Sequence, residues 1–145
     1  ATVTFVLIAC YMGPVPCFSA EDMWLGTTFA GLQICQGGSC ADSPTDVDGK
    51  TTFTLPIKGG GHSNRDAGER TFVYVNGIQI PQYLDLQFNS PDLNGDLLVN
   101  LSDTVLFASD CVSGSYAYRS DFHYDQQLNL SDTVLYSCGV GKACP

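Results

Sequence analysis

Acidic and amide side chains recur at fixed intervals in the C-terminal third of the sequence. The stretches PDLNGDLLVNLSDTVLF (91–107) and SDFHYDQQLNLSDTVLY (120–136) share the seven letters NLSDTVL at an offset of 29 residues, from Asn100 to Asn129. With this offset, side-chain oxygens stand at positions 1, 5, 9 and 12 of both copies, where the residues are Asp92, Asp96, Asn100 and Asp103, and Asp121, Asp125, Asn129 and Asp132. Clustered oxygens of this kind are the ligands that hard divalent cations prefer.

The first copy has the spacing of a calcium loop of the EF-hand type. Such a loop takes oxygens from positions 1, 3, 5, 7, 9 and 12, with a backbone carbonyl at position 7. Every position is filled here, by Asp92, Asn94, Asp96, the carbonyl of Leu98, Asn100 and Asp103. We therefore predict that this loop binds Ca²⁺ and that a short helix begins after position 12, at TVLFAS.

The second copy predicts a second calcium site with a weaker position 3. Its oxygens would come from Asp121, Asp125, the carbonyl of Gln127, Asn129 and Asp132. His123 stands at position 3, where a nitrogen ligand suits calcium poorly, so water or the remaining oxygens must serve. In both copies the alternative is that Asp and Asn only cap helices and bend turns. Repetition in register favours calcium.

Two departures from ordinary EF-hands mark both loops. Position 6 is Leu97 or Gln126 instead of glycine, and position 12 is Asp instead of Glu. In these features, and in the string DLNGDLLVNLSD, residues 89–145 resemble the dockerin modules of secreted bacterial proteins. The resemblance implies a duplicated calcium-binding module with two ions, whose helices can dock onto a cohesin partner.

Residues 1–88 have the pattern of a turn-rich β domain. Clusters of Gly, Pro, Asn and Asp separate runs rich in β-branched and aromatic residues, which are TVTFVLI, DMWLGTTF, GKTTFTLPI, TFVYVNGIQI and LDLQF. Asp48-Gly49 predicts a turn into an alternating strand, and Asn76-Gly77 predicts a tight hairpin. Short strands at this spacing predict a β-sandwich.

The order of GPVPCFSAEDMWL, TDVDGKTTFTL and FVYVNG resembles the bacterial immunoglobulin-like domains of surface and adhesion proteins. The resemblance covers about the first 85 residues and implies an immunoglobulin-like β-sandwich over residues 1–88. Little chain precedes Gly13, so one edge strand of such a domain would be missing. The whole chain is then expected to be mainly β, with a small C-terminal module of calcium loops and helices.

The N-terminal run is apolar on both faces of its pleat from Phe5 to Ile8, a pattern typical of a strand buried on both sides. A strand near the end of a chain usually lies at a sheet edge and needs cover. Three interpretations stay open: the strand lies inside its own sandwich, it is the remnant of an export signal, or it completes the sheet of a neighbouring subunit. The third makes an assembly strand of Thr4, Phe5, Val6, Leu7 and Ile8.

Charge and cysteine content limit the partners and the location. A net charge of -9 with six Lys and Arg excludes a nucleic-acid partner, because phosphate binding needs clustered cations. Seven cysteines without a Cys-x-x-Cys pair predict a disulfide framework and a secreted, extracellular or cell-surface protein. The odd thiol could bridge to another chain or stay buried and free. The longest apolar run, residues 5–12, is too short to span a membrane.

Catalytic residues are not evident. His62 and His123 are the two histidines that could act as general bases near neutral pH. His62 lies in KGGGHSNRD, which we interpret as a flexible, solvated glycine-rich loop; no Gly-Lys-Ser/Thr follows to make it a phosphate loop. We therefore predict that the protein is not an enzyme.

Two functions fit these observations. The first is a structural subunit of a surface assembly or filament, braced by calcium, which associates with itself or with neighbouring surface proteins through the N-terminal strand. The second is a dockerin-type binding module. Its helices would engage a cohesin-like partner through Val105 and Leu106 or their repeat mates Val134 and Leu135.

Overall fold

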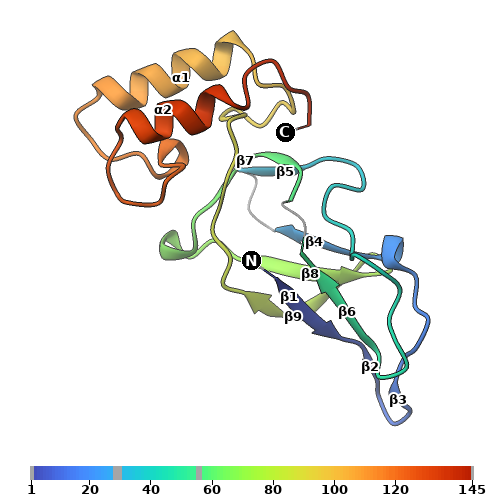
Figure 1. The fold of residues 1–145 in the computed structure, drawn as a ribbon. Helices are drawn as coiled ribbons and strands as arrows, with labels where there is room; N and C mark the ends of the chain where they lie inside the picture. Colours follow the sequence, from blue (N-terminus) through green and yellow to red (C-terminus); the bar gives the residue numbers. More distant parts are fainter. Residues whose placement is uncertain (1, 28–30, 55–56, 145) are drawn as a thin grey trace. The chain divides into compact units, whose positions relative to one another are not determined.

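A computed structural model of the protein describes residues 2–27, 31–54 and 57–144. Across these residues, short strands make up four small sheets, and the α-helices are α1 (Leu101–Val112) and α2 (Leu130–Ser137) (Figure 1). The mainly β class expected from the sequence is confirmed. No helix within the described ranges is long and apolar enough to cross a bilayer.

The chain divides into two compact units that interleave in sequence. Unit 1 comprises residues 1–26, 36–57 and 71–84, and unit 2 comprises residues 27–35, 58–70 and 85–145. The whole segment 89–145 therefore lies in one unit, together with two segments from the first half of the chain. A domain boundary at residue 88 stays a prediction.

Unit 1 contains three small sheets. Antiparallel pairs form between β1 (Val3–Val6) and β6 (Lys50–Phe53) and between β2 (Ile8–Ala9) and β3 (Gly13–Pro14). The third sheet has the order β4 (Met23–Thr27), β8 (Thr71–Val75) and β9 (Ile78–Leu84), with β8 and β9 antiparallel. The predicted hairpin is confirmed, because Asn76 and Gly77 have φ of 48° and 80° in the tight turn between β8 and β9. Two positive φ angles give such a turn the twist of the flanking strands.

The N-terminal strand differs from its prediction. β1 has one partner, β6, in a two-stranded sheet, and its side chains alternate between half-buried and exposed. The expectation of burial on both faces is wrong, because a two-stranded sheet here covers one face only. Residues 4–8 also do not form one strand: β1 ends at Val6, and exposed Ile8 begins β2. Their role in assembly stays a prediction.

Unit 2 contains a sheet of three short strands, in the order β10 (Phe88–Asn89), β7 (Gly59–Ser63) and β5 (Leu32–Ile34). The central strand is the segment interpreted as a flexible loop, and that interpretation is wrong. Neighbours pair with β7 on both edges, and Gly59, Gly60 and Gly61 are buried. His62 is half-buried instead of solvated, and burial lowers the pKa of its imidazole.

The two helices begin earlier than predicted. Asn100 caps α1 by accepting a hydrogen bond from Ser102, and Asp103 completes a capping box with the backbone of Asn100. The same box forms at Asn129 and Asp132 in α2. Position 12 of each loop therefore lies in the first helical turn, not before it, because the Asn at position 9 satisfies the free N–H groups of the helix start.

A small aromatic core joins the two helices. The buried side chains of Leu93, Val99, Phe107 and Tyr136 form it, and the rings of Phe107 and Tyr136 stack with centroids 4.6 Å apart. Leu106 packs against this cluster from α1. A core of this size is too small to stabilise the module alone, so other interactions must contribute.

A half-buried ion pair fixes the end of α1 to the segment that leads into the second loop. Arg119 donates to both oxygens of Asp110 at 2.7 and 2.8 Å, and the Ser120 hydroxyl donates at 2.6 Å. These hydrogen bonds, those of Arg119 first, hold the pKa of Asp110 below its ordinary value. The guanidinium also balances a carboxylate that the C-terminal end of a helix disfavours.

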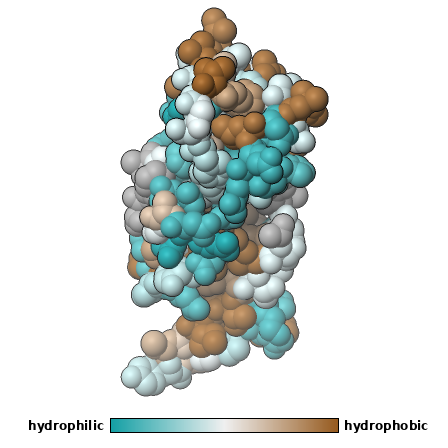
Figure 2. All heavy atoms as spheres, turned by 90° about the vertical axis from the view of Figure 1, so that its left-hand side faces the viewer, coloured by the Kyte–Doolittle hydropathy of each residue, from teal (hydrophilic) through white to brown (hydrophobic). Residues whose placement is uncertain are grey.

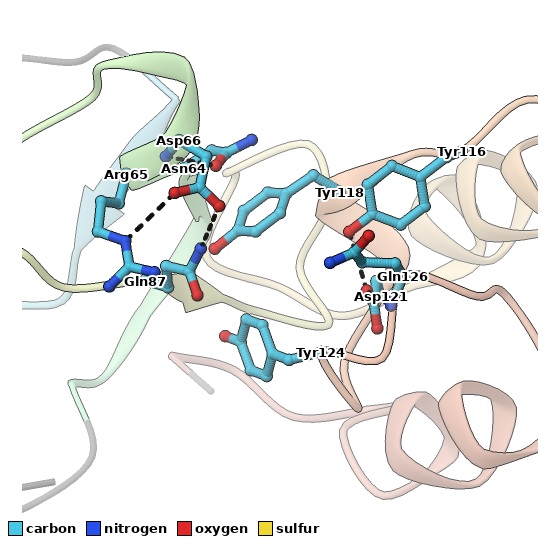
Figure 3. Close-up of a pocket in the computed structure, with 9 residues that line it drawn as sticks. All are labelled: Asn64, Arg65, Asp66, Gln87, Tyr116, Tyr118, Asp121, Tyr124 and Gln126. Atoms are coloured by element: carbon cyan, nitrogen blue, oxygen red, sulfur yellow. Dashed lines mark hydrogen bonds and ion pairs between the residues drawn. The ribbon is translucent and has the colours of Figure 1, made fainter.

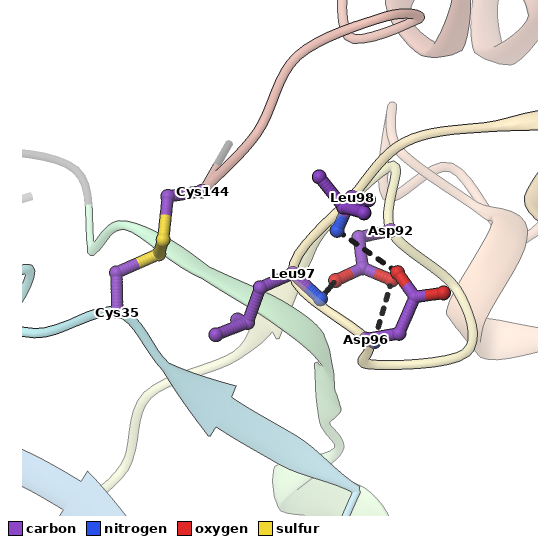
Figure 4. Close-up of a disulfide and its surroundings, with 6 residues drawn as sticks. All are labelled: Cys35, Asp92, Asp96, Leu97, Leu98 and Cys144. Atoms are coloured by element: carbon purple, nitrogen blue, oxygen red, sulfur yellow. Dashed lines mark hydrogen bonds between the residues drawn. A yellow bond between two sulfur atoms is a disulfide. The ribbon is translucent and has the colours of Figure 1, made fainter.

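One disulfide joins Cys35 to Cys144 in unit 2, across a sequence separation of 109 residues (Figure 4). The sequence predicted a disulfide framework; the described chain has this bridge, and its other cysteines are free thiols, at Cys10, Cys17, Cys40, Cys111 and Cys138. Next to the bridge, the backbone N–H of Cys144 donates to the carbonyl of Leu97 at 2.7 Å. The bridge therefore holds the C-terminal segment against the first loop.

Replacing both bridged cysteines by serine should lower the free energy of unfolding of unit 2 by about 2–4 kcal/mol, because the bridge restricts a long loop in the unfolded chain. Urea denaturation at constant calcium measures this change. Cys10→Ser with Cys138→Ser is the matched control, since both thiols are free and exposed. An equal loss of stability in the control pair would contradict the assignment.

Candidate metal centre

Two groups of three aspartates can each hold a metal ion. The first contains Asp92, Asp96 and Asp103, and the second contains Asp121, Asp125 and Asp132. Within each group, one carboxylate oxygen per residue lies within 4.8 Å of the others. These residues are positions 1, 5 and 12 of the two predicted loops, so the fold brings together the acids that the sequence pattern selected.

Four of the six carboxylates are buried. The exposed fraction is 0 % for Asp92, Asp103 and Asp132 and 1 % for Asp121. Among the described residues, none of the four forms an ion pair with a Lys, Arg or His side chain. Burying an ionised carboxylate without a counter-charge is very costly. A divalent cation in each loop would supply that charge, and this is the observation that fits a metal to the site.

Backbone N–H groups orient the carboxylates of the first loop. Asp92 accepts from Gly95 and Asp96 at Oδ1 and from Leu97 at Oδ2, with distances of 2.9, 3.2 and 2.6 Å. Asp103 accepts from Asn94 at 3.1 Å with one oxygen and from Asn100 at 2.9 Å with the other. These bonds wrap the loop around its acids (Figure 4).

The second loop repeats the same pattern 29 residues later. Asp121 accepts from Asp125 at 3.2 Å and from Gln126 at 2.9 Å. Asp132 accepts from His123 at 3.0 Å with Oδ1 and from Asn129 at 3.0 Å with Oδ2. Because the two loops differ in part of their sequence yet adopt the same hydrogen-bond pattern, the sequence repeat is also a structural repeat.

Position 6 explains how the loops bend without glycine. Leu97 and Gln126 adopt left-handed φ angles of 68° and 64°. This conformation costs an ordinary residue about 1–2 kcal/mol. The N–H of each donates to the carboxylate at position 1, which offsets the cost.

The other predicted ligands lie at the loops in mixed roles. Asn94 donates from Nδ2 to Asp96 Oδ2, and its Oδ1 accepts from the backbone N–H of Asp96. The Leu98 carbonyl accepts from the side-chain amide of Asn100 at 3.4 Å. Asn100 uses its Oδ1 as the helix cap, and Asn129 does the same for α2. Helix capping and a metal loop therefore coexist here. Metal coordination by Asn94, Leu98, Asn100, Gln127 and Asn129 stays a prediction.

His123 distinguishes the second loop. Its Nδ1 lies 3.3 Å from Asp125 Oδ2, whereas Asn94 holds this position in the first loop. The exposed Asp125 carboxylate has a lowered pKa, first because the backbone N–H of Gln127 donates to it and further because His123 and Asn129 bond it. Position 3 of this loop thus brings an imidazole where the first loop brings an amide oxygen.

The carboxyl of Asp92 in the first loop has a raised pKa. Burial raises the pKa of its carboxyl, and the nearby charge of Asp103 raises it further, against the opposing effect of the backbone donors. A carboxylate that resists ionisation in the metal-free protein is the group that a cation would stabilise most.

The triple glycine of β7 supports this carboxylate, a role that the sequence analysis missed. A Cβ atom at Gly60 would overlap the Asp92 carboxylate, and the Gly61 N–H donates to the Asp92 carbonyl at 2.6 Å. Ser90 in turn donates to the Gly61 carbonyl at 3.0 Å. Only a strand without side chains admits a loop this close. Three consecutive glycines were the available signal.

No protein-family model, curated protein or solved structure matches this chain.

Changing Gly60 to Ala should disturb the first loop and spare the second. The added methyl group overlaps Asp92, and such overpacking costs about 1–3 kcal/mol, enough to weaken metal binding at this loop about tenfold. Calcium titration followed by the NMR amide signals of Leu97 and Gln126 separates the loops. Gly68→Ala is the control for backbone strain: Gly68 has a φ of 84°, yet nothing lies within 4 Å of an added Cβ, so both loops should keep their affinities. Equal weakening of both loops would contradict the direct contact.

Changing His123 to Asn should raise the calcium affinity of the second loop about tenfold, because an amide oxygen replaces a nitrogen at position 3. Isothermal titration calorimetry measures the two affinities. The reciprocal change, Asn94→His, should weaken the first loop. If neither exchange alters its own loop, position 3 plays no part in coordination.

Proposed function

We propose that the protein is an extracellular, non-catalytic module, stabilised by two calcium ions, which docks onto a cohesin-like partner through the outer faces of α1 and α2. The observation that carries the proposal is repeated exposure. Leu101 and Leu130 are 76 % and 75 % exposed, and Val105 and Val134 are 60 % and 55 % exposed, at equivalent positions of the two helices.

Calcium is the metal that the donors favour. The candidate ligands of each loop are carboxylate, amide and carbonyl oxygens, with one imidazole in the second loop. Oxygen ligands from a flexible loop suit Ca²⁺ better than Mg²⁺, which demands near-ideal octahedral geometry, or Zn²⁺, which prefers nitrogen and sulfur. Two Ca²⁺ would add four positive charges against a formal net charge of -9.

The exposed apolar residues support docking because the module's own core does not use them. Leu106 packs against the aromatic core, whereas Leu101, Val105, Leu130 and Val134 point outward. Figure 2 shows apolar surface in the upper part of the molecule, where Figure 1 places both helices. Apolar side chains repeated on exposed helices are typical of protein-binding faces.

The remaining features fit a surface or secreted protein. The Cys35–Cys144 bridge needs an oxidising compartment in most organisms. As part of the proposal, residues 1–88 form an immunoglobulin-like sandwich and residues 89–145 a dockerin-like module, as in the bacterial proteins that the sequence resembles.

A structural subunit that assembles through β1 is the second candidate, because the outer edge of β1 pairs with no other strand in the described ranges. The N–H of Leu7 donates to Gly49, so by the two-residue period of a strand Thr4 and Val6 direct their N–H groups away from β6. Those N–H groups could donate to the backbone carbonyls of a strand from a neighbouring copy.

Removing calcium with a chelator should destabilise unit 2. At a Ca²⁺ concentration one hundred times the dissociation constant, each bound ion contributes about 2.7 kcal/mol to the free energy of unfolding. Thermal unfolding with calcium, with chelator and with magnesium measures the effect. Unchanged unfolding in all three conditions would remove calcium from the proposal.

Docking is tested by biolayer interferometry against immobilised bacterial cohesin modules in millimolar calcium. Leu101→Asp with Leu130→Asp should abolish binding, while Val112→Asp, an exposed residue of α1 without an apolar repeat mate, should leave it unchanged. If no cohesin binds, and electron microscopy shows filaments that Thr4→Pro or Val6→Pro disperses, the assembly function replaces docking.

A further inference from the structure

A cleft of about 370 Å³ lies in unit 2 beside the second loop. Three tyrosines line it, Tyr116, Tyr118 and Tyr124 (Figure 3). Figure 3 shows the rings of Tyr118 and Tyr124 in the middle, with Asp66 and Gln87 on one side and Asp121 and Gln126 on the other. Docking through α1 and α2 does not use this cleft, and among its lining residues Asp121 alone is a predicted metal ligand.

The repeat shows that Tyr124 is not needed by the loop. Its equivalent in the first loop is Gly95, and both residues have left-handed φ angles, 57° for Tyr124 and 73° for Gly95. Glycine adopts this conformation freely, whereas a tyrosine is strained there. A strained residue where the sister loop keeps glycine indicates that the ring itself is used.

Hydrogen bonds and a ring contact hold the tyrosines in place. Tyr118 donates to the Ser63 carbonyl at 3.0 Å, and its ring centroid lies 6.3 Å from that of Tyr124. Tyr116 donates to Asp121 Oδ2 at 2.8 Å.

Polar side chains flank the rings. On one side, the Asp66 carboxylate accepts from Gln87 Nε2 at 3.1 Å and from Arg65 Nε at 3.3 Å. On the other side, the Gln126 backbone N–H donates to Asp121 Oδ2, and the side-chain amide of Gln126 lines the cleft. The cleft therefore offers aromatic surface together with hydrogen-bond donors and acceptors.

We propose that this cleft binds a neutral saccharide, with the C–H face of a sugar ring on Tyr118 and Tyr124 and its hydroxyls bonded by Asp66, Gln87 and Gln126. Sugar rings present apolar faces and hydroxyl rims, which match amphipathic tyrosines beside amides and a carboxylate. Polar groups placed around an otherwise apolar contact supply orientation and specificity.

Other ligands fit the cleft less well. An anion would face the Asp66 and Asp121 carboxylates, and Arg65, the one cation of the described lining, already pairs with Asp66. A proline-rich peptide also binds aromatic grooves, but proline has no N–H to donate to the acceptors of Asp66, Gln87 and Gln126. A sugar provides both donors and acceptors.

NMR titration of the labelled protein in millimolar calcium tests the proposal, with cello-, xylo-, manno-, laminari- and chito-hexaose as probes and a proline decamer alongside. We expect at least one hexaose to shift the signals of Tyr118, Tyr124 and Gln126. No shift with any hexaose, or a cleft response to the proline decamer alone, would overturn the proposal.

Tyr124→Gly is the decisive variant, because it removes the ring and restores the residue that the sister loop carries. Affinity for the binding hexaose should fall about tenfold, while thermal stability and calcium affinity stay equal or rise. Tyr11→Ala, which removes a fully exposed tyrosine of unit 1, should bind as the wild type does. Unchanged hexaose affinity in Tyr124→Gly, or an equal loss of affinity in Tyr11→Ala, would show that the hexaose does not bind in this cleft. These readouts do not depend on a cohesin partner.

Discussion

The structure of the C-terminal part of this protein depends on four buried carboxylates, those of Asp92, Asp103, Asp121 and Asp132. Backbone N–H groups bond each of them, yet the described residues place no cationic side chain beside them. Hydrogen bonds reduce the cost of burying charge but do not remove it. The loops, the starts of both helices and the small aromatic core between them therefore depend on balancing this charge.

The rest of unit 2 is arranged to keep the first loop in place. The three glycines at the start of β7 admit the Asp92 carboxylate, and the Cys35–Cys144 bridge holds the C-terminal segment that bonds Leu97. The second loop has a different support, since the Asp110–Arg119 pair fixes the segment that leads into it. The two copies of one motif thus contact different neighbours, and a cleft lies beside the second copy.

The two copies differ at positions 2, 3, 4, 6, 7 and 8 of the loop, while the acids at positions 1, 5 and 12 are identical. Position 4 changes from Gly95 to Tyr124, and position 3 from Asn94 to His123. Both loops keep the same backbone bonds, so side chains at positions 3 and 4 can change with little effect on the bend. In our proposal, both loops stabilise the fold, and the second loop also lines a ligand-binding cleft.

The sequence by itself determined the mainly β class, the Asn76-Gly77 hairpin and the acids that come together at each loop, because these depend on local spacing and turn chemistry. Tertiary structure decided the rest. Gly59–Gly61 lie in a buried strand because β5 and β10 pair with it and the Asp92 loop packs on Gly60, and β1 is half-exposed because it pairs with β6 in a two-stranded sheet. Which of seven cysteines pair, and which tyrosines share a cleft, depends on contacts between distant segments, which spacing along the chain does not encode.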